Sequence, residues 1–305
     1  MTAADHIATD WAAGQRDLYA ALARAVAAAA PATPDAAAAL ADATVAALPG
    51  EPGQRLRAVD AGLLRAIARH AAGFDPVAGA SRLPALLAAA PAAPLFLPEI
   101  AASRHTALPT RGERPDMPAF SDRAFDPWFA ATGAAYGLGL YGEKRSVYAT
   151  DQFADAASPE RRTIHLGVDV FAPAGTPVHA PLPGRVASVA YNADPLDYGH
   201  TLIVEHALDG LRFFTLYGHL GASLPTLCQP GQPVATGQII AHLGDWPENG
   251  GWAAHVHFQI IADRLAQGPN FFGVAHESLW PVWTAISPDP NLLMRLPQAA
   301  FRHDG

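Results

Sequence analysis

Two stretches decide the fold of this chain, Thr163-Ile164-His165-Leu166-Gly167-Val168-Asp169-Val170 and, about ninety residues later, Ala254-His255-Val256-His257-Phe258-Gln259-Ile260. In both, polar side chains that can bind a metal alternate with apolar ones, which is the spacing of a β-strand. On an extended backbone His165 and Asp169 point to one face, and so do His255 and His257. Two such strands would bring three imidazoles and a carboxylate to one point, and these are typical zinc ligands.

The composition limits the classes of protein to consider. The chain has 305 residues, a net charge of −8 and 50% hydrophobic residues, enough for one large or two modest domains with a buried core. Its basic residues are not concentrated in one stretch, which argues against binding to nucleic acid or to an anionic membrane surface. A single cysteine, Cys228, excludes an internal disulfide framework and a cysteine-rich zinc site. Metal would therefore be held by histidine and carboxylate.

The N-terminus carries no recognisable targeting segment. Its first residues lack a positively charged n-region, and its apolar runs are rich in alanine and broken by Arg, Asp and Pro. The sequence contains no run of about 18 apolar residues, so we predict no membrane span. The simplest interpretation is a cytoplasmic protein, with processing of a longer precursor as the alternative.

Residues 1–95 are predicted to form an α-helical domain. Apolar residues recur at helical spacing over residues 10–30, and Thr33-Pro34 is a typical helix start for a second helix that ends before Pro49. A third helix is expected over residues 53–72 and a short fourth over residues 82–90. The region contains no catalytic constellation. It is either a packing domain or a surface for a partner or a second copy of the chain.

The remaining chain divides into three parts. Residues 96–135 form a Pro-rich connecting segment, of a composition that rarely forms regular elements. This segment either wraps a surface or reaches toward the active-site groove as an inhibitory pro-segment would. Residues 136–287 contain short apolar runs separated by Gly and Pro turns, which predicts a mainly antiparallel sheet domain and an α+β chain overall. Residues 288–305 are expected to be a loosely attached tail.

The polar residues of the sheet domain suggest an assignment of roles. We assign zinc to His165, Asp169 and His257, because three protein ligands leave a fourth position for water, whose pKa the metal lowers toward 7. His255 lies one pleat away on the same strand face, at about 6–7 Å by strand rise, which suits contact with the water or the substrate rather than ligation. His219, which follows an apolar strand, is predicted to act as a general base or a proton donor.

A series of further motifs accompanies these residues between about residue 140 and residue 262. It comprises His165-Leu166-Gly167-Val168-Asp169, Ala174-Gly175-Thr176-Pro177-Val178-His179-Ala180, Pro183-Gly184-Arg185-Val186, Tyr198-Gly199-His200-Thr201-Leu202-Ile203-Val204-Glu205-His206, Leu216-Tyr217-Gly218-His219-Leu220, Gly231-Gln232-Pro233-Val234-Ala235-Thr236-Gly237-Gln238-Ile239-Ile240 and His255-Val256-His257-Phe258. The series resembles the lysostaphin-like, or LytM-type, zinc metallopeptidases, also called Gly-Gly endopeptidases. The resemblance implies a β fold of the duplicated hybrid motif type, zinc ligation by His165, Asp169 and His257, and catalytic roles for His219 and His255. It also implies hydrolysis of peptide bonds in bacterial cell-wall peptidoglycan.

One stretch departs from the pattern of that family. Residues 244–254 contain Trp246 and Trp252, where the family more often has a short loop of Gly, Ser and Thr. We expect both tryptophans, together with Tyr217 in the motif of His219, to border the substrate groove. A groove so reshaped is expected to differ from that of a standard cell-wall enzyme.

Three functions compete at this point. The first is a zinc endopeptidase that cleaves peptides, with peptidoglycan as the substrate that the resemblance implies. The second is a non-catalytic peptide-binding or regulatory protein of the same fold, although relatives of that kind usually lose metal ligands and here none is lost. The third is a lipoyl-type carrier domain, which needs a modifiable lysine at a hairpin tip, whereas the only lysine, Lys144, lies outside the matching stretches. The other histidines of the sheet domain are predicted to be structural, namely His179, His200, His206 and His242, with His206 able to support the site indirectly.

Overall fold

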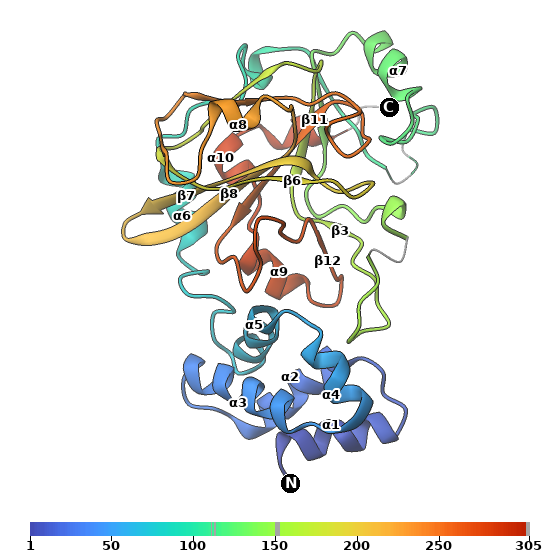
Figure 1. Cartoon of the computed structure of the whole chain (residues 1–305), viewed down its shortest axis with the longest axis vertical. Coiled ribbons are helices and arrows are strands. Elements are labelled where there is room, and N and C mark those ends of the chain that lie inside the picture. Colours follow the sequence, from blue (N-terminus) through green and yellow to red (C-terminus); the bar gives the residue numbers. More distant parts are fainter. Residues whose placement is uncertain (111, 113, 150–152, 303–305) are drawn as a thin grey trace.

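Helices form the N-terminal part of the chain and strands dominate the rest (Figure 1), in a computed structural model that describes residues 1–110, 112, 114–149 and 153–302. The α- and 3₁₀-helices are α1 (Ala3–Ala12), α2 (Leu18–Ala29), α3 (Pro34–Ala47), α4 (Gly50–Arg57), α5 (Ala61–Ala71), α6 (Leu83–Ala89), η1 (Ile100–Ala102), α7 (Phe125–Ala131), η2 (Ser146–Ala149), α8 (Leu224–Leu227), α9 (Trp280–Ile286), α10 (Asn291–Met294) and η4 (Gln298–Phe301). The strands are β1 (His105–Ala107), β2 (Tyr136–Gly139), β3 (Ile164–His165), β4 (Val168–Phe171), β5 (Pro177–His179), β6 (Gly184–Asn192), β7 (Gly199–Leu208), β8 (Leu211–Leu220), β9 (Pro233–Val234), β10 (Ile239–His242), β11 (His255–Ile261) and β12 (Val274–Ala275). The predicted α+β class with a helical N-terminal region is confirmed.

Capping and apolar packing explain the helical region. The hydroxyl of Thr33 accepts a hydrogen bond from the backbone N–H of Ala36 at 3.1 Å, and Pro34 is the first residue of α3, as predicted. Leu22 of α2 and Ile67 of α5 are buried between the helices. Helices α1 to α5 gather at one end of the molecule, where α5 faces α9 (Figure 1).

Two of the predicted helices are each divided into two. Residues 10–30 belong to α1 and α2, because Gly14 between them adopts φ +94°, a left-handed conformation that ends a helix. Residues 53–72 belong to α4 and α5. There the side chain of Asp60 starts the second helix by accepting a hydrogen bond from the N–H of Leu63 at 3.0 Å. Apolar periodicity continued through both breaks, so only the capping residues marked them.

One large sheet carries the strands that matter for function. Its order is β1-β2-β4-β11-β8-β7-β6-β9, with β1 and β2 parallel and the other pairs antiparallel. Strand β11 lies between β4 and β8, and all of its residues are buried. Val256, Phe258 and Ile260 of β11 pack into the apolar core. The alternate positions on β11 therefore face the opposite side of the sheet.

The Pro-rich segment contains more regular structure than predicted. Strand β1 pairs with β2, so residues 105–107 form the edge of the main sheet. Phe120 and Phe125 of this segment pack against Phe171 of β4, with ring centroids 4.6 and 5.1 Å apart. The expectation of a segment without regular elements is therefore wrong, because its large apolar residues complete a second core on the sheet.

The C-terminal tail is also better attached than predicted. Leu293, Leu296 and Ala300 are 3%, 7% and 5% exposed. Arg295 donates a hydrogen bond to the backbone oxygen of Ala88 in α6. Residues 288–302 are thus packed on the domain, whereas residues 303–305 of the predicted tail lie outside the described residues.

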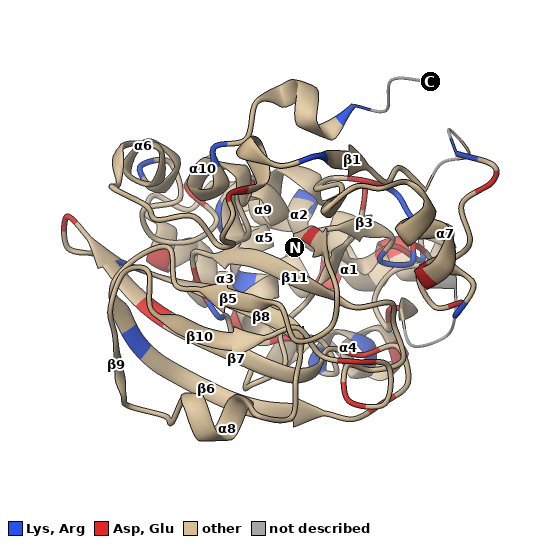
Figure 2. Ribbon diagram, turned by 90° about the horizontal axis from the view of Figure 1, so that it is seen from above, with Lys and Arg blue, Asp and Glu red and all other residues tan. Residues whose placement is uncertain are grey.

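Charged residues are distributed over helices, strands and loops (Figure 2). Exposed ion pairs such as Arg65–Asp42, at 2.9 Å, and Arg82–Asp209, at 2.8 Å, link neighbouring elements. In the part of the chain that the structure describes, no helix is long and apolar enough to cross a lipid bilayer.

Candidate metal centre and active-site pocket

Three buried side chains converge at one point beside β11. His165 Nε2 lies 3.0 Å from His257 Nδ1, and Asp169 Oδ1 lies 3.2 Å from both nitrogens. The register of β4 on β11 puts Asp169 opposite His257, and the pairing of β3 with β12 places His165 beside them. The structure therefore brings the three predicted metal ligands together.

The backbone between the first two ligands is not one strand. The predicted strand from His165 to Phe171 is interrupted at Leu166-Gly167, between β3 and β4. A β carbon on Gly167 would lie 2.5 Å from Cε1 of His257, closer than carbon atoms can approach. The absence of a side chain at this position lets the chain pass directly over the imidazole of the third ligand.

The hydrogen bonds of the two imidazoles determine which nitrogen is free. His165 Nδ1 lies 2.8 Å from the backbone oxygen of Leu140, which can only accept, so Nδ1 carries the proton. His257 Nε2 lies 2.9 Å from Gln259 Oε1, and the amide nitrogen of Gln259 donates to the backbone oxygen of Phe272 and to Ser287 Oγ. The amide oxygen of Gln259 therefore accepts the proton of His257 Nε2.

This arrangement fits a bound cation. The two facing nitrogens of His165 and His257 both carry lone pairs, and at 3.0 Å they repel each other unless a positive ion lies between them. Burial, followed by the charge of Arg145, lowers the pKa of His165 to about 4, so this imidazole is neutral, as a metal ligand must be. Two imidazole nitrogens and one carboxylate oxygen are a donor set that suits zinc.

The second oxygen of Asp169 is bound by an arginine that the sequence analysis did not identify. Arg145 Nη1 lies 2.7 Å from Asp169 Oδ2, and Arg145 Nε lies 3.0 Å from Glu143 Oε2, with all three side chains buried. Burial alone would raise the pKa of Asp169, but His165 and Arg145 hold it well below its usual range. Asp169 is therefore a carboxylate with one oxygen, Oδ1, turned toward the two imidazoles.

Two more imidazoles lie next to the candidate metal centre. His255 of β11 and His219 at the end of β8 have ring centroids 4.3 Å apart, and His255 Nε2 lies 3.9 Å from Asp169 Oδ1. His255 Nδ1 donates to the backbone oxygen of Ala253 at 2.7 Å, and His219 Nδ1 donates to that of Asn249 at 2.8 Å. Both rings therefore present an Nε2 lone pair as a proton acceptor.

Burial keeps these two imidazoles neutral. It lowers the pKa of His255, and burial together with the neighbouring His255 lowers the pKa of His219 well below its usual range. His219 also adopts φ +62°, a left-handed conformation that is uncommon for a residue with a side chain. Its backbone N–H donates to the oxygen of Tyr198 at 2.7 Å, which holds it in this position.

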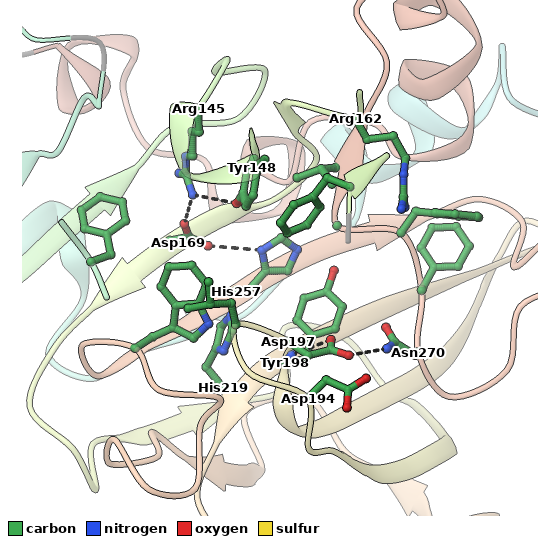
Figure 3. A pocket seen from close by; sticks show the side chains of 18 of the residues that line it. Arg145, Tyr148, Arg162, Asp169, Asp194, Asp197, Tyr198, His219, His257 and Asn270 are labelled. Atoms are coloured by element: carbon green, nitrogen blue, oxygen red, sulfur yellow. Dashed lines mark hydrogen bonds and ion pairs between the residues drawn. The ribbon is translucent and has the colours of Figure 1, made fainter. Parts of the chain in front are cut away.

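Asp169 and His257 of the candidate metal centre and the two further histidines line one pocket of about 320 Å³, which is seen from close by in Figure 3. Its lining combines His219, His255 and His257 with Arg145, Tyr148 and Arg162 on one side. Asp194, Asp197 and Asn270 line the other side, where Asn270 donates to Asp197 at 2.8 Å (Figure 3). The pocket can thus place a polar substrate beside the candidate metal and two neutral bases.

The predicted groove residues fare differently. Trp252 lines the pocket and Trp246 is not among its lining residues, so the place of Trp246 at a groove stays a prediction. Trp246 Nε1 donates to Asp126 of α7 at 2.7 Å. The expectation for Tyr217 is wrong, because its side chain is 0% exposed. Tyr217 is fully buried in the core against Phe258, because the β7–β8 register shifts just before His219 and breaks the alternation that would have put both residues on one face.

Tyr198 is a further pocket residue, to which the sequence motifs assigned no role. Its ring packs against His257 and His219, with centroids 5.1 and 5.7 Å apart, and its buried hydroxyl has no hydrogen-bond partner among the described residues. A β carbon on Gly218 or on Gly273 would collide with Tyr198. Arg145 lies outside the quoted motifs, and Tyr198 begins one of them without a recognisable role, so only their positions in the fold reveal what they contact.

The Pro-rich segment reaches the pocket. Phe120 lines it, and the backbone oxygen of Phe120 accepts a hydrogen bond from the N–H of Ala253 at 2.8 Å. The N–H of Thr110 donates to Glu143 Oε1 at 2.6 Å, and Glu143 also binds Arg145. This segment therefore forms part of the pocket wall.

The other histidines of the sheet domain lie apart from the pocket lining. His206 of β7, the residue considered for indirect support, forms hydrogen bonds with the backbone oxygen of Pro183 and with the hydroxyl of Thr215 on β8. His179 lies 3.2 Å from the backbone oxygen of Leu95, and His200 stacks on Tyr191. Cys228 is buried and its thiol lies 3.3 Å from the backbone oxygen of Ile240.

Comparison with known proteins identifies the middle of the chain. Residues 163–269 match the sequence model of Peptidase family M23. An uncharacterized metalloprotease of Haemophilus influenzae is 38% identical over 105 residues, which are 34% of this chain and 20% of that protein. The uncharacterized lipoprotein YgeR of Escherichia coli is 33% identical over 103 residues, 34% of this chain and 37% of that protein. The chain thus spans about a fifth and under two fifths of these relatives.

The chain was also compared with solved structures. A zinc-containing peptidase from Vibrio cholerae is 30% identical, with a TM-score of 0.27, over 34% of this chain and 31% of that chain. The predicted resemblance to this class of peptidase is confirmed by the family match over residues 163–269.

Proposed function

We propose, from the Peptidase family M23 domain that residues 163–269 form, that this chain is a zinc-dependent peptidase. One observation carries the proposal. Two imidazole lone pairs and a carboxylate oxygen meet within 3.2 Å of one another, and two further neutral imidazoles face the same pocket. Metal ligands and proton-transfer groups are thus present together, as hydrolysis of a peptide bond requires.

The side chains suggest how the protons move. Hydrolysis forms a C–O bond from water to the carbonyl carbon, breaks the C–N bond and adds a proton to the leaving nitrogen. Zinc held by His165, Asp169 and His257 would lower the pKa of water toward about 7 and polarise the scissile carbonyl. The Nε2 atoms of His255 and His219 are positioned to accept the proton from the attacking water and to return one to the leaving amine.

The finer proposal concerns the substrate. We propose an endopeptidase that acts on peptides of the kind found in peptidoglycan, and this rests on the motif series that resembles lysostaphin-like enzymes. A non-catalytic peptide-binding protein of the same fold is the alternative. The complete set of His165, Asp169 and His257, with His219 and His255 beside it, favours hydrolysis, because a binding protein needs no proton-transfer group.

A digest with and without a chelator tests the proposal. The full chain is incubated with cross-linked peptidoglycan and with a peptide library, and its zinc content is measured in parallel. We expect about one zinc per chain in wild type and in His219→Ala, little zinc in His257→Ala, and cleavage in wild type alone. The exposed His70 provides the control variant His70→Ala, which should behave as wild type.

The outcomes separate the alternatives. Wild type without stoichiometric zinc, or His257→Ala with as much zinc as wild type, would contradict the ligand assignment. Retained zinc without cleavage of any peptide would favour the binding protein. Cleavage of library peptides but not of peptidoglycan would keep the peptidase and reject the finer substrate.

A further inference from the structure

The N-terminal helices contact two segments that contribute residues to the pocket lining, here called the wall segments. One is residues 153–163, before β3, which contribute Phe153 and Arg162 to the lining. The other is residues 262–273, between β11 and β12, which contribute Gln267 and Asn270. In Figure 1, α2 and α5 lie at the end of the molecule next to α9 and β12. The helical domain is therefore placed to influence the pocket.

Asp60, the capping residue of α5, binds the 262–273 segment directly. Its Oδ2 accepts a hydrogen bond from Gln267 Nε2 at 2.6 Å and another from the backbone N–H of Ala266 at 3.2 Å. Close packing adds to these bonds, since a β carbon on Gly62 of α5 would lie 2.7 Å from Cβ of Leu265. One carboxylate thus caps a helix of the N-terminal domain and holds a pocket residue from the sheet domain.

A chain of hydrogen bonds continues from this segment to a proposed catalytic histidine. Asn270 Nδ2 donates to Asp197 Oδ2 at 2.8 Å, on one side of the pocket. Asp197 Oδ1 accepts from the N–H of Tyr198 at 2.7 Å, and the oxygen of Tyr198 accepts from the N–H of His219 at 2.7 Å. A displacement of the 262–273 segment would therefore be transmitted toward His219.

The 153–163 segment is held by α2. The N–H of Leu18 donates to the oxygen of Ala157 at 2.8 Å, and the buried hydroxyl of Tyr19 lies 2.8 Å from Asp155 Oδ2. Asp155 also lies 3.1 Å from Nε2 of the fully buried His276, just after β12. Both wall segments are consequently fixed to the N-terminal domain by buried or half-buried polar contacts.

We propose that the N-terminal helices position the substrate site without lining it, with Asp60 as a positioning residue that sets the pocket wall formed by residues 262–273. The helical domain then determines how tightly a substrate binds, while the metal ligands and the two histidines carry out the chemistry. The kinetic part of this inference rests on the proposed peptidase function, but the structural part does not.

Two variants of the full chain test the inference. Asp60→Ala removes the bonds to the 262–273 segment. Gly62→Ala leaves Asp60 in place and introduces alanine, a good helix former, whose methyl group pushes against Leu265. This variant therefore tests the inference even if Asp60→Ala folds poorly. The matched control is Asp42→Ala, which removes the exposed ion pair with Arg65 on the same helical domain and touches neither wall segment.

The first readout is amide hydrogen exchange, which needs no substrate. We expect exchange in residues 262–273 and 193–198 to become roughly tenfold faster in both test variants and to stay unchanged in Asp42→Ala. The second readout is kinetic, on whichever peptide the library digest identifies. We expect KM to rise roughly three- to tenfold with kcat changed by less than about twofold and zinc content unchanged.

Asp60→Asn keeps an oxygen that can accept the hydrogen bonds, so its KM should be close to that of wild type. Exchange in the two segments that matches Asp42→Ala would overturn the inference, even if no peptide is ever cleaved. Normal KM with accelerated exchange would also overturn it, because the helices would then hold the wall without affecting the substrate.

Discussion

Two groups of residues with buried histidines lie on strands of the sheet domain, a closed group around His206 and an open group of His165, His219, His255 and His257. They differ in whether all nitrogens of the histidines have protein partners. In the closed group, His206 Nδ1 lies 2.8 Å from the oxygen of Pro183, His206 Nε2 lies 2.8 Å from Thr215 Oγ1, and that hydroxyl lies 3.1 Å from the hydroxyl of Tyr217. In the open group, the free nitrogens of His165 and His257 face each other, and those of His219 and His255 face the pocket.

The difference shows what separates a structural histidine from a functional one. The histidines of both groups are buried on strands. In the sequence, the histidines of both groups stand beside apolar residues, so the local pattern does not distinguish them. The closed group satisfies every polar atom with a protein partner, so it needs nothing from outside. The open group keeps its lone pairs free by giving each outer N–H an acceptor, which leaves a place for a cation and for a substrate.

The largest effect is expected from removing the arginine of the open group. Arg145→Met leaves the buried carboxylates of Asp169 and Glu143 without their shared cation, which costs about 3–5 kcal/mol of unfolding free energy. Added zinc should recover part of this loss, because it supplies a positive charge beside Asp169. Urea unfolding with and without zinc measures both effects.

Lys144→Met is the matched control for this prediction. Lys144 forms an exposed ion pair with Glu277 at 2.7 Å, so its loss should cost less than about 1 kcal/mol. Equal unfolding free energies of the Arg145 and Lys144 variants would show that the buried carboxylates of Asp169 and Glu143 do not need the positive charge of Arg145.

The closed group should make stability depend on pH. Burial lowers the pKa of His206 from 6.5 to about 4, so below pH 6.5 the unfolded chain binds a proton that the folded chain does not. The stability contributed by neutral His206 is present above pH 6.5 and is lost as the pH falls through 4. The unfolding free energy contributed by His206 should therefore be on the order of 3 kcal/mol lower below pH 4 than above pH 6.5.

Urea unfolding at pH 7.5 and pH 4.5 checks this expectation. His206→Gln should lose clearly less stability over that interval than wild type, whereas the exposed-residue variant His70→Gln should lose as much as wild type. A wild-type slope in His206→Gln would mean that the imidazole is charged in the folded protein and that the group is not closed.

A smaller effect is expected from the residue that sets the tautomer of His257. Gln259→Leu removes the acceptor of the Nε2 proton, so the Nδ1 lone pair is no longer held toward the ion. We expect zinc to bind about 10- to 100-fold more weakly. Competition with a chelating dye measures the affinity, and Gln54→Leu on the surface of α4 serves as control. Unchanged zinc affinity would assign Gln259 a packing role only.

The features that could be predicted from the sequence are those that depend on a local pattern of residues. Alternation placed His255 and His257 on one strand face, and the His165–Asp169 spacing survived the interruption at Leu166-Gly167 because both residues still reach β11. Thr33-Pro34 marked a helix start for the same reason, since a cap is a local hydrogen bond.

The parts that it missed depend on contacts between distant segments. Arg145 stands outside the quoted motifs and Tyr198 begins one without a recognisable role, and only folding brings them to Asp169 and His257. Tyr217 was misplaced because a register shift between β7 and β8 has no signature in a run of apolar residues. The Pro-rich segment was misjudged because Phe120 and Phe125 gain their partners from β4.

Gly167 has a consequence for anyone who would move this centre to another protein. It lies between two ligands in the sequence and against the third in space, where a β carbon would come within 2.5 Å of the His257 ring. Copying only the residues that hold the ion would install alanine or a larger side chain there in most β scaffolds and push the imidazole aside. The transferable unit is His165, Gly167, Asp169 and His257 together, in which three residues supply atoms and one supplies space.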